Sequence, residues 1–288
     1  MSKPSSPAVR DRRLLWVLTL SALVAAGLLL LILLFLGREA WPVLVSVGIS
    51  SFLLDPSWYP TEGTFGMTPM LAASMGMSAL AVAIAAPLGV ASALFCRFYA
   101  PSAVARLYRW TVVLLAGIPS VVLGLWGLTA LVPLINQLSP PGTSLLAGSV
   151  VLALMIFPTI ALTTEAALTS VSQSYWNGAA ALGLSREAIV LGVALPAARS
   201  SIAAGVLLAS ARALGETMAV LMVSGNVVQL PLSIFDPVRT LTANIALEMA
   251  YATGDHRASL FVSGLALTLL VLALAVAARR SGGQVVHA

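Results

Sequence analysis

The sequence predicts an all-α, polytopic membrane helical bundle with six transmembrane helices, and three observations support this. Hydrophobic residues make up 59% of the 288 residues, charged residues only 9%, and the mean hydropathy is +1.00. A soluble domain carries about 25% charged residues, so the composition excludes a soluble enzyme, a disordered chain and a fibrous repeat. The apolar residues also form uncharged runs long enough for a bilayer span of about 20 residues.

Six spans can be placed along the chain. The first is the uncharged stretch 14–36, which is too long for the apolar part of a signal peptide and is followed by a poor cleavage site, so we expect a retained helix. The uncharged stretch 110–164 is long enough for two spans, and the turn-forming segment 136–142 divides it. The other three spans are expected at about 70–95, 200–223 and 258–278.

The charges between the spans predict the orientation. Eleven basic residues and two acids lie in the segments 1–13, 96–109, 170–199 and 279–288. Three basic residues and six acids lie in the opposite segments 37–69, 135–144 and 224–257. Because basic residues are retained on the cytoplasmic side, we expect 1–13 and 279–288 to be cytoplasmic tails. The segment 37–69 is then an extracytoplasmic segment along the membrane interface.

Residue counts exclude several kinds of site. Cys96 is the only cysteine, so no intrachain disulfide can form. His256 and His287 are too few and too far apart for a metal site, and we expect both to be solvated. The only lysine is Lys3, so a phosphate-binding loop of the Gly-x-x-x-x-Gly-Lys type is impossible. We expect no catalytic site, metal or cofactor on this chain, and no nucleic-acid partner.

The loop 170–199 is the most informative segment outside the spans. It is too polar to cross a membrane, yet apolar residues recur in it at helical spacing. The pattern predicts a short helix, a turn near Gly183 and a second short helix stopped by Pro196. The apolar side of such a loop must be buried, either on the membrane surface or in a groove of another protein.

The spacing within this loop resembles the EAA loop of bacterial ABC importer permeases. That loop reads Glu-Ala-Ala, three residues, Gly, nine residues, Ile, one residue and Leu-Pro. This chain has, at the same spacings, Asn177-Gly178-Ala179, Gly183, Val193 and Leu195-Pro196. The chain departs from the pattern at Asn177 and Gly178, which replace the Glu and the first Ala, and at Val193, which replaces the Ile. The resemblance implies a coupling helix that sits in a cleft of an ATPase subunit.

Three further stretches, 66–71, 115–134 and 212–226, point to one group of permeases within this family. Together they make residues 60–278 similar to phosphate ABC transporter permease subunits of the PstC type. The resemblance implies the ABC type I importer permease fold, with a core at 70–278. It implies import of inorganic phosphate across the bacterial inner membrane. It also implies three partners, namely a homologous PstA-like permease, a cytoplasmic ATPase dimer that uses ATP and an extracytoplasmic phosphate-binding protein.

Charged residues within the fifth span are candidates for the transport path. Arg212 lies about 12 residues into this span, near the middle of the bilayer, where an arginine costs about 3 kcal/mol. Glu216 follows one helical turn later, so the two are expected to share a face and can pair. The pair is either structural or lines a path for an oxyanion. Thr217 and Ser210 flank it and either contact substrate or bond their own helix.

Other residues are assigned simpler roles. Pro119 and Ser120 are expected to break a helix. We expect Glu165 to be solvated at the membrane interface, and Asp236, Glu248 and Asp255 to form a solvated outer rim.

Two alternatives remain open from the sequence. The chain could be a permease for another oxyanion, such as phosphonate, sulfate or molybdate. It could also be a secondary transporter without an ATPase, which should show an inverted internal repeat and a second set of charges within the membrane, and neither is visible.

Overall fold

The computed structural model describes residues 7–282, and side chains from 14 to 280. Residues 1–6 and 283–288 of the two expected tails, with Lys3 and His287, lie outside this range. Five of the described helices are long and apolar enough to cross a membrane, and a sixth crossing results if one pair of helices bent by 95° forms a single span. The predicted helical membrane bundle is therefore confirmed. Five of the expected spans are single helices, and the count of six holds only if the bent pair crosses as one span.

The first helix, α1 (Pro7–Val47), continues well past the predicted end at residue 36. Charged Arg38 and Glu39 do not end it, because single charges at a helix surface are compatible with helical backbone. A short helix α2 (Ile49–Leu54) follows, after Gly48 at φ +86°. An antiparallel hairpin then pairs Trp58 with Phe65 and Tyr59 with Thr64. The hairpin consists of β1 (Trp58–Tyr59), a 3₁₀ turn (Pro60–Glu62) and β2 (Thr64–Phe65).

Helices α3 (Thr68–Leu94) and α7 (Leu145–Thr169) form the centre of the bundle. At one close approach, a Cβ added to Gly89 would lie 2.8 Å from Cγ2 of Ile160. Small residues allow helix backbones to approach closely in membranes. The main apolar core accordingly lies between α3 and α7, where Met77, Leu152 and Ile156 are buried.

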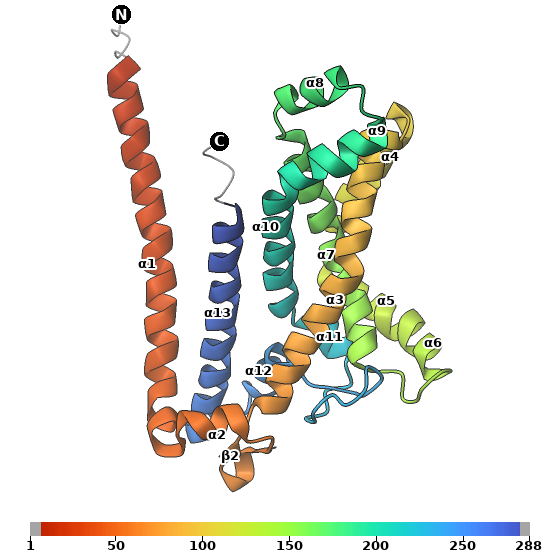
Figure 1. The fold of residues 1–288 in the computed structure, drawn as a ribbon. Helices are drawn as coiled ribbons and strands as arrows, with labels where there is room; N and C mark the ends of the chain where they lie inside the picture. Colours follow the sequence, from red (N-terminus) through yellow and green to blue (C-terminus); the bar gives the residue numbers. More distant parts are fainter. Residues whose placement is uncertain (1–6, 283–288) are drawn as a thin grey trace, which may run out of the picture.

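The bent pair consists of α4 (Ser102–Ala116) and α5 (Ser120–Trp126), with α6 (Val132–Asn136) continuing α5. The break covers residues 117–119, where Pro119 has extended backbone and Ser120 begins α5. Pro119 disfavours helical geometry at the residue before it. The chain therefore turns away from the bundle, and α5 and α6 project to one side in Figure 1.

Three π-helical turns each precede a proline at the same distance. They are Phe95–Tyr99 before Pro101, Gly127–Leu131 before Pro133 and Val190–Ala194 before Pro196. In each, the N–H of the residue before the proline bonds to a carbonyl five residues earlier. A proline has no N–H and its ring clashes with the carbonyl four residues before it. The widened turn relieves this clash. The helix continues through Pro133 and Pro196, whereas the backbone is extended at Ala100 and α4 begins anew after Pro101.

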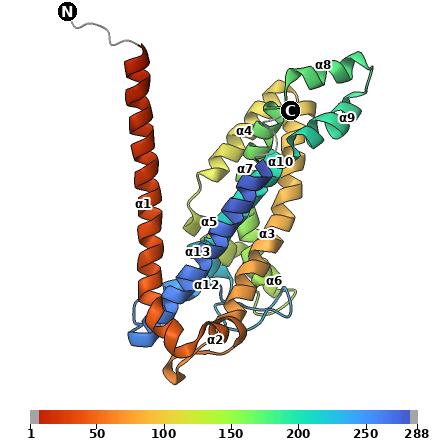
Figure 2. The same cartoon turned by 60° about the vertical axis from the view of Figure 1, so that its left-hand side comes forward.

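The second half of the chain returns through shorter elements. These are α8 (Gln173–Ala181), α9 (Arg186–Ile189), α10 (Leu195–Leu214), α11 (Met218–Val223), α12 (Leu241–Glu248) and α13 (Gly254–Gly282). Figures 1 and 2 show that the start of α1, the end of α13 and the α8–α9 segment lie toward one end of the molecule. The hairpin and α12 lie toward the other end. This arrangement agrees with the predicted placement of the termini and the loop 170–199 on one side, although the orientation in the membrane remains a prediction.

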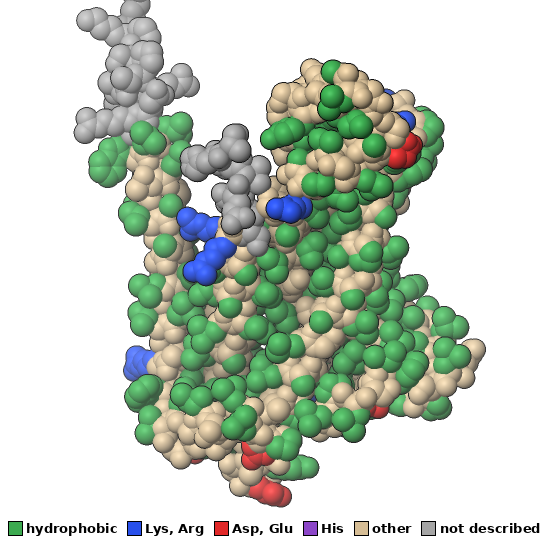
Figure 3. All heavy atoms as spheres, in the orientation of Figure 1, with side chains coloured by type: hydrophobic (Ala, Val, Ile, Leu, Met, Phe, Trp, Pro, Cys, Tyr) green, Lys and Arg blue, Asp and Glu red, His purple; other side chains and the backbone are tan. Residues whose placement is uncertain are grey.

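The surface matches a membrane protein. On the face drawn in Figure 3, hydrophobic side chains cover the long helices, and acidic side chains gather at the end that carries the hairpin. We refer to this end as the outer end and to the end that carries α8 and α9 as the inner end.

Candidate functional site

The candidate path residues lie at a break between two helices. Helix α10 ends at Leu214 and α11 begins at Met218, so residues 215–217 are not helical. Arg212 is therefore in the last turn of α10, whereas Glu216 lies beyond it. The expectation that both share one helical face is wrong, because the helix ends between them. Among the described residues, no ion pair joins Arg212 to Glu216.

Glu216 instead stabilises the start of α11. Its Oε1 accepts a hydrogen bond from the backbone N–H of Ala219 at 3.3 Å, and a carboxylate near a helix N-terminus is favourable. Its backbone carbonyl accepts a hydrogen bond from Oγ1 of Thr242 at 2.8 Å, which ties the break to α12. Two hydrogen bonds of Glu216, one to α11 and one to α12, thus fix the non-helical segment 215–217.

The two hydroxyl candidates bond to nearby backbone. Thr217 Oγ1 donates to the carbonyl of Gly215 at 3.5 Å, and Ser210 Oγ donates to the carbonyl of Val206 at 2.9 Å. Both bonds are of the local kind that membrane serines and threonines commonly form.

Arg212 lies on the side of α10 that faces away from the core. Ala209 and Ala213 are buried in the core shared with α3 and α7, whereas Leu208 and Arg212 are exposed. Another side of α10 is packed closely on α7, because a Cβ added to Gly205 would lie 2.5 Å from Oγ1 of Thr163. An exposed arginine this far along a membrane helix is costly against lipid. It therefore requires an aqueous path or another chain.

The loop 170–199 forms a helix, a turn and a second helix. Helix α8 carries Asn177, Gly178 and Ala179, and Gly183 makes the following turn with φ +69°. A side chain other than glycine is strained at that φ. The second helix is not stopped by Pro196. It continues through the π turn Val190–Ala194 into α10, with Leu195 and Pro196 in the first turn of α10.

One side of the loop packs on the bundle and the other is open. The ring of Trp176 on α8 lies 5.2 Å from that of Phe98, and Ala179 is buried. Arg186 on α9 lies over the ring of Tyr99, at 5.3 Å from its centre. Large apolar side chains remain exposed on the other side, and Leu182 is 79% exposed. The loop is thus held by aromatic contacts and presents apolar groups at the inner end.

An ion pair at the inner end was missed from the sequence. Glu165 on α7 pairs with Arg109 on α4, although we expected Glu165 to be simply solvated. The residues lie 56 positions apart in the sequence, so no local spacing could indicate the pair.

The outer end holds a second unpredicted feature, a polar network around Glu248. Its side chain accepts from Trp58 Nε1 at 3.0 Å and from Arg239 Nη1 at 2.7 Å, and it lies 2.8 Å from His256 Nε2. Glu248 is only 7% exposed, so it does not belong to a solvated rim, and His256 is a partner rather than a free surface group. Asn244 accepts a further bond from Arg239.

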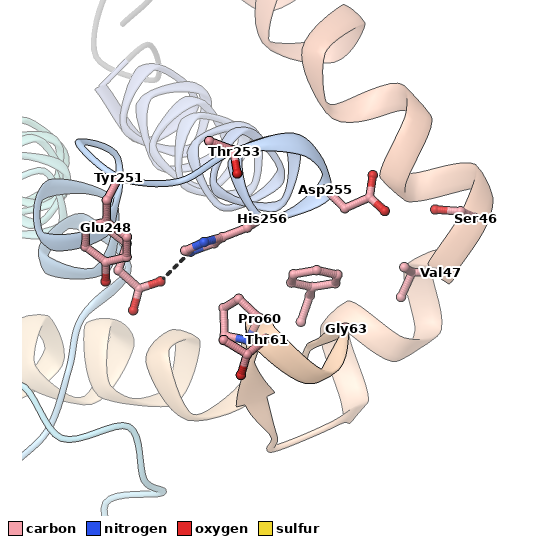
Figure 4. A pocket seen from close by; sticks show the side chains of 11 residues that line it. Ser46, Val47, Pro60, Thr61, Gly63, Glu248, Tyr251, Thr253, Asp255 and His256 are labelled. Atoms are coloured by element: carbon pink, nitrogen blue, oxygen red, sulfur yellow. Dashed lines mark hydrogen bonds and ion pairs between the residues drawn. The ribbon is translucent and has the colours of Figure 1, made fainter.

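Figure 4 shows the cavity beside this network, with the Glu248–His256 contact as a dashed line. The cavity has a volume of about 790 Å³ and lies between the end of α1, the hairpin and the start of α13. Its wall includes Thr61, Tyr251 and Asp255. Within residues 7–282, no group of three or more histidine, cysteine or acidic side chains is arranged to hold a metal ion.

Comparison with known proteins identifies the family. Residues 85–282 match the family described as binding-protein-dependent transport system inner membrane component. The chain belongs to this family. The match includes the break after Arg212 and the whole loop 170–199, so the predicted resemblance to ABC importer permeases is confirmed. The chain is accordingly a multi-pass component of the inner membrane.

Individual relatives agree with this assignment. The chain is 38% identical over 262 residues to the probable ABC transporter permease protein YqgH of Bacillus subtilis. The matched region covers 89% of this chain and 85% of the relative. It is 35% identical over 281 residues to the phosphate transport system permease protein PstC of Mesorhizobium japonicum, covering 87% and 86%.

Solved structures support the fold. A chain of the inward-facing MetNI methionine ABC transporter is similar with a TM-score of 0.60 and 19% identity, covering 80% of this chain and 100% of that chain. At this identity the likeness supports the permease fold alone.

Proposed function

We propose that the chain forms part of the path for inorganic phosphate in an ATP-driven importer. The observation that carries this proposal is the exposed Arg212 at the break between α10 and α11, on the side of α10 that the core leaves open. Relatives that cover most of the chain are named phosphate transport system permeases, which supports phosphate as the substrate.

The chemistry of Arg212 suits a tetrahedral oxyanion. Phosphate carries between one and two negative charges near pH 7, and a guanidinium can donate two parallel hydrogen bonds to its oxygens. Because the Glu216 carboxylate caps α11, it is close in sequence without neutralising the arginine.

Energy comes from other chains in this proposal. The chain binds no cofactor itself, and ATP is hydrolysed by a cytoplasmic ATPase dimer. The exposed apolar side of the loop 170–199 docks on that dimer. Its exposed groups include Leu182, directly after α8, and Leu191 in the π turn after α9. An apolar helical surface that has no cover on its own chain is suited to a groove of a partner.

Two further partners complete the importer. A homologous PstA-like permease covers the side of α10 that carries Arg212, and an extracytoplasmic phosphate-binding protein delivers the substrate at the outer end. The family description, which names a binding-protein-dependent system, supports the last partner.

Replacement of Arg212 by glutamine tests the proposal. Uptake of radiolabelled phosphate by cells that lack other phosphate importers should fall by about tenfold or more, since a charge-assisted hydrogen bond contributes about 1.5–3 kcal/mol. Arg212→Lys should be intermediate, because it keeps the charge but loses the paired donors. Arg38→Gln, at an exposed arginine on α1, is the control and should transport normally. Normal uptake by Arg212→Gln in an assembled complex would refute the role.

A further inference from the structure

The loop between α11 and α12, residues 224–240, is held in a single shape by many hydrogen bonds. Its two ends are joined because the N–H of Val238 donates to the carbonyl of Ser224 at 2.8 Å, and the N–H of Asn226 donates to that of Val238 at 3.1 Å. Near its middle, the carboxylate of Asp236 accepts from the N–H groups of Leu232 and Ser233 at 3.0 and 2.7 Å.

The loop is also fixed to the bundle. The N–H groups of Leu145 and Leu146, at the start of α7, donate to the carbonyls of Asp236 and Ile234 at 2.9 and 2.8 Å. Phe235 packs against the main core. In Figures 1 and 2 the loop lies at the outer end near α6. The loop is therefore a fixed projection of the bundle.

This fixed loop exposes apolar side chains. Leu232 is 92% exposed, and Val227, Leu230 and Ile234 are exposed as well. We call these four residues the apolar tip. No charged residue occurs from 225 to 235, and the one nearby carboxylate, Asp236, is used to hold the loop. An apolar surface that is held rigidly has little conformational entropy to lose on binding, which favours a protein partner.

We infer that the apolar tip docks on the homologous permease subunit at the outer mouth of the transporter. This inference rests on the proposed function, in which a second permease covers the open side of α10. The loop continues directly from α11, which begins next to that side and exposes Met218. The docked tip would extend the contact between the two permeases from the membrane to the outer end.

Two other partners fit the tip less well. Segments that lie in the lipid headgroup region are rich in tryptophan, tyrosine, lysine and arginine, and none of these occurs from 225 to 235. A solute-binding protein that delivers substrate from solution would form a transient interface, and transient interfaces are less hydrophobic than permanent ones. The uncharged tip matches the permanent class.

Site-specific photocrosslinking in the assembled transporter tests the inference. A benzophenone amino acid is placed at Leu232 in the complex of both permeases, the ATPase and the binding protein. We expect an adduct with the second permease, equally strong with and without the binding protein. The control position is Leu54, the last residue of α2, which is 77% exposed and should give no such adduct. Helix α2 lies on the α1 side of the outer end in Figure 1, away from α6 and the loop 224–240.

A paired substitution gives a second measurement. Leu230→Ser with Leu232→Ser should lower several-fold the amount of second permease that co-purifies, while membrane levels of this chain and the binding of the ATPase at the inner end stay unchanged. Leu54→Ser should leave co-purification unchanged.

The failures of the two proposals are distinguishable. If the unmodified chain co-purifies with no second permease, the proposed function fails. If the complex assembles and transports phosphate, but Leu232 crosslinks only to the binding protein, only to lipid or to nothing, the docking inference alone is overturned.

Discussion

Glu248 and Arg239 form an ion pair at 2.7 Å that is largely withdrawn from solvent at the outer end. The pair connects α12 to the loop 224–240, and Trp58 extends the connection to the hairpin through the same carboxylate. His256 completes it from the start of α13. One carboxylate thus joins the hairpin, 190 residues away, to three segments that follow one another near the end of the chain.

Replacement of Glu248 by glutamine should destabilise the protein. One side of the glutamine amide is a donor, and it would face the donor groups of Trp58 or Arg239. Removal of one partner from a buried pair costs about 3 kcal/mol or more. The melting temperature of the purified complex in detergent should fall. Glu62→Gln is the control, because Glu62 is exposed in the 3₁₀ turn of the hairpin, and should change stability by less than about 0.5 kcal/mol. An unchanged melting temperature for Glu248→Gln would contradict the role of the network.

A methyl group at Gly89 should disturb the packing of α3 on α7. It would lie 2.8 Å from Cγ2 of Ile160 and 3.3 Å from the backbone nitrogen of Ala161, so the helices must move apart. Overpacking of this kind costs about 1–3 kcal/mol. Thermal melting of Gly89→Ala should show the loss. Gly27→Ala adds the same group where nothing lies within 4 Å, and equal melting temperatures for the two variants would argue against the close approach.

Pro196 maintains the π turn between the coupling loop and α10. In Pro196→Ala the restored N–H can bond to the carbonyl of Gly192, so the segment 190–194 should become regular α-helix. The change rotates α8 and α9 relative to α10 by about one residue, roughly 100°. We expect ATP hydrolysis to continue while phosphate uptake falls, measured in the same vesicles. Full uptake by this variant would show that the turn has no part in coupling.

Leu182 should contribute to the binding of the ATPase. It is exposed at the turn after α8, and Leu182→Ser removes apolar surface without affecting the core. The amount of ATPase that co-purifies should fall several-fold, whereas Leu54→Ser, at the outer end, should leave it unchanged. Retention of the ATPase by Leu182→Ser would place the docking surface elsewhere.

The sequence predicts the apolar helices well, because the cost of burying charge in lipid makes long uncharged runs unmistakable. The helix, turn and helix of the loop 170–199 were also predictable, since Gly183 marks a position that needs a positive φ. The end of α10 at Leu214 was not predicted. Periodicity continues through Arg212 to Glu216, and only tertiary contacts such as that from Thr242 show that the helix stops.

The polar network at the outer end was not predictable for a different reason. Trp58 and Glu248 are separated by 190 residues, and a single sequence contains no signal that pairs them. Glu248 resembles an ordinary charged residue near a membrane surface until its burial is known. The continuation of the helix through Pro196 was missed because a proline is a strong stop signal, and the π turn that accommodates it has no clear sequence pattern.

Reconstituted transport tests the central claim most directly. Vesicles that contain this chain with its second permease and the ATPase, supplied with the phosphate-binding protein, should accumulate radiolabelled phosphate only when ATP is present. An excess of unlabelled phosphate should compete, and an excess of sulfate should not. Accumulation without ATP or without the ATPase, or equal competition by sulfate, would contradict the account of this chain as the phosphate path of an ATP-driven importer.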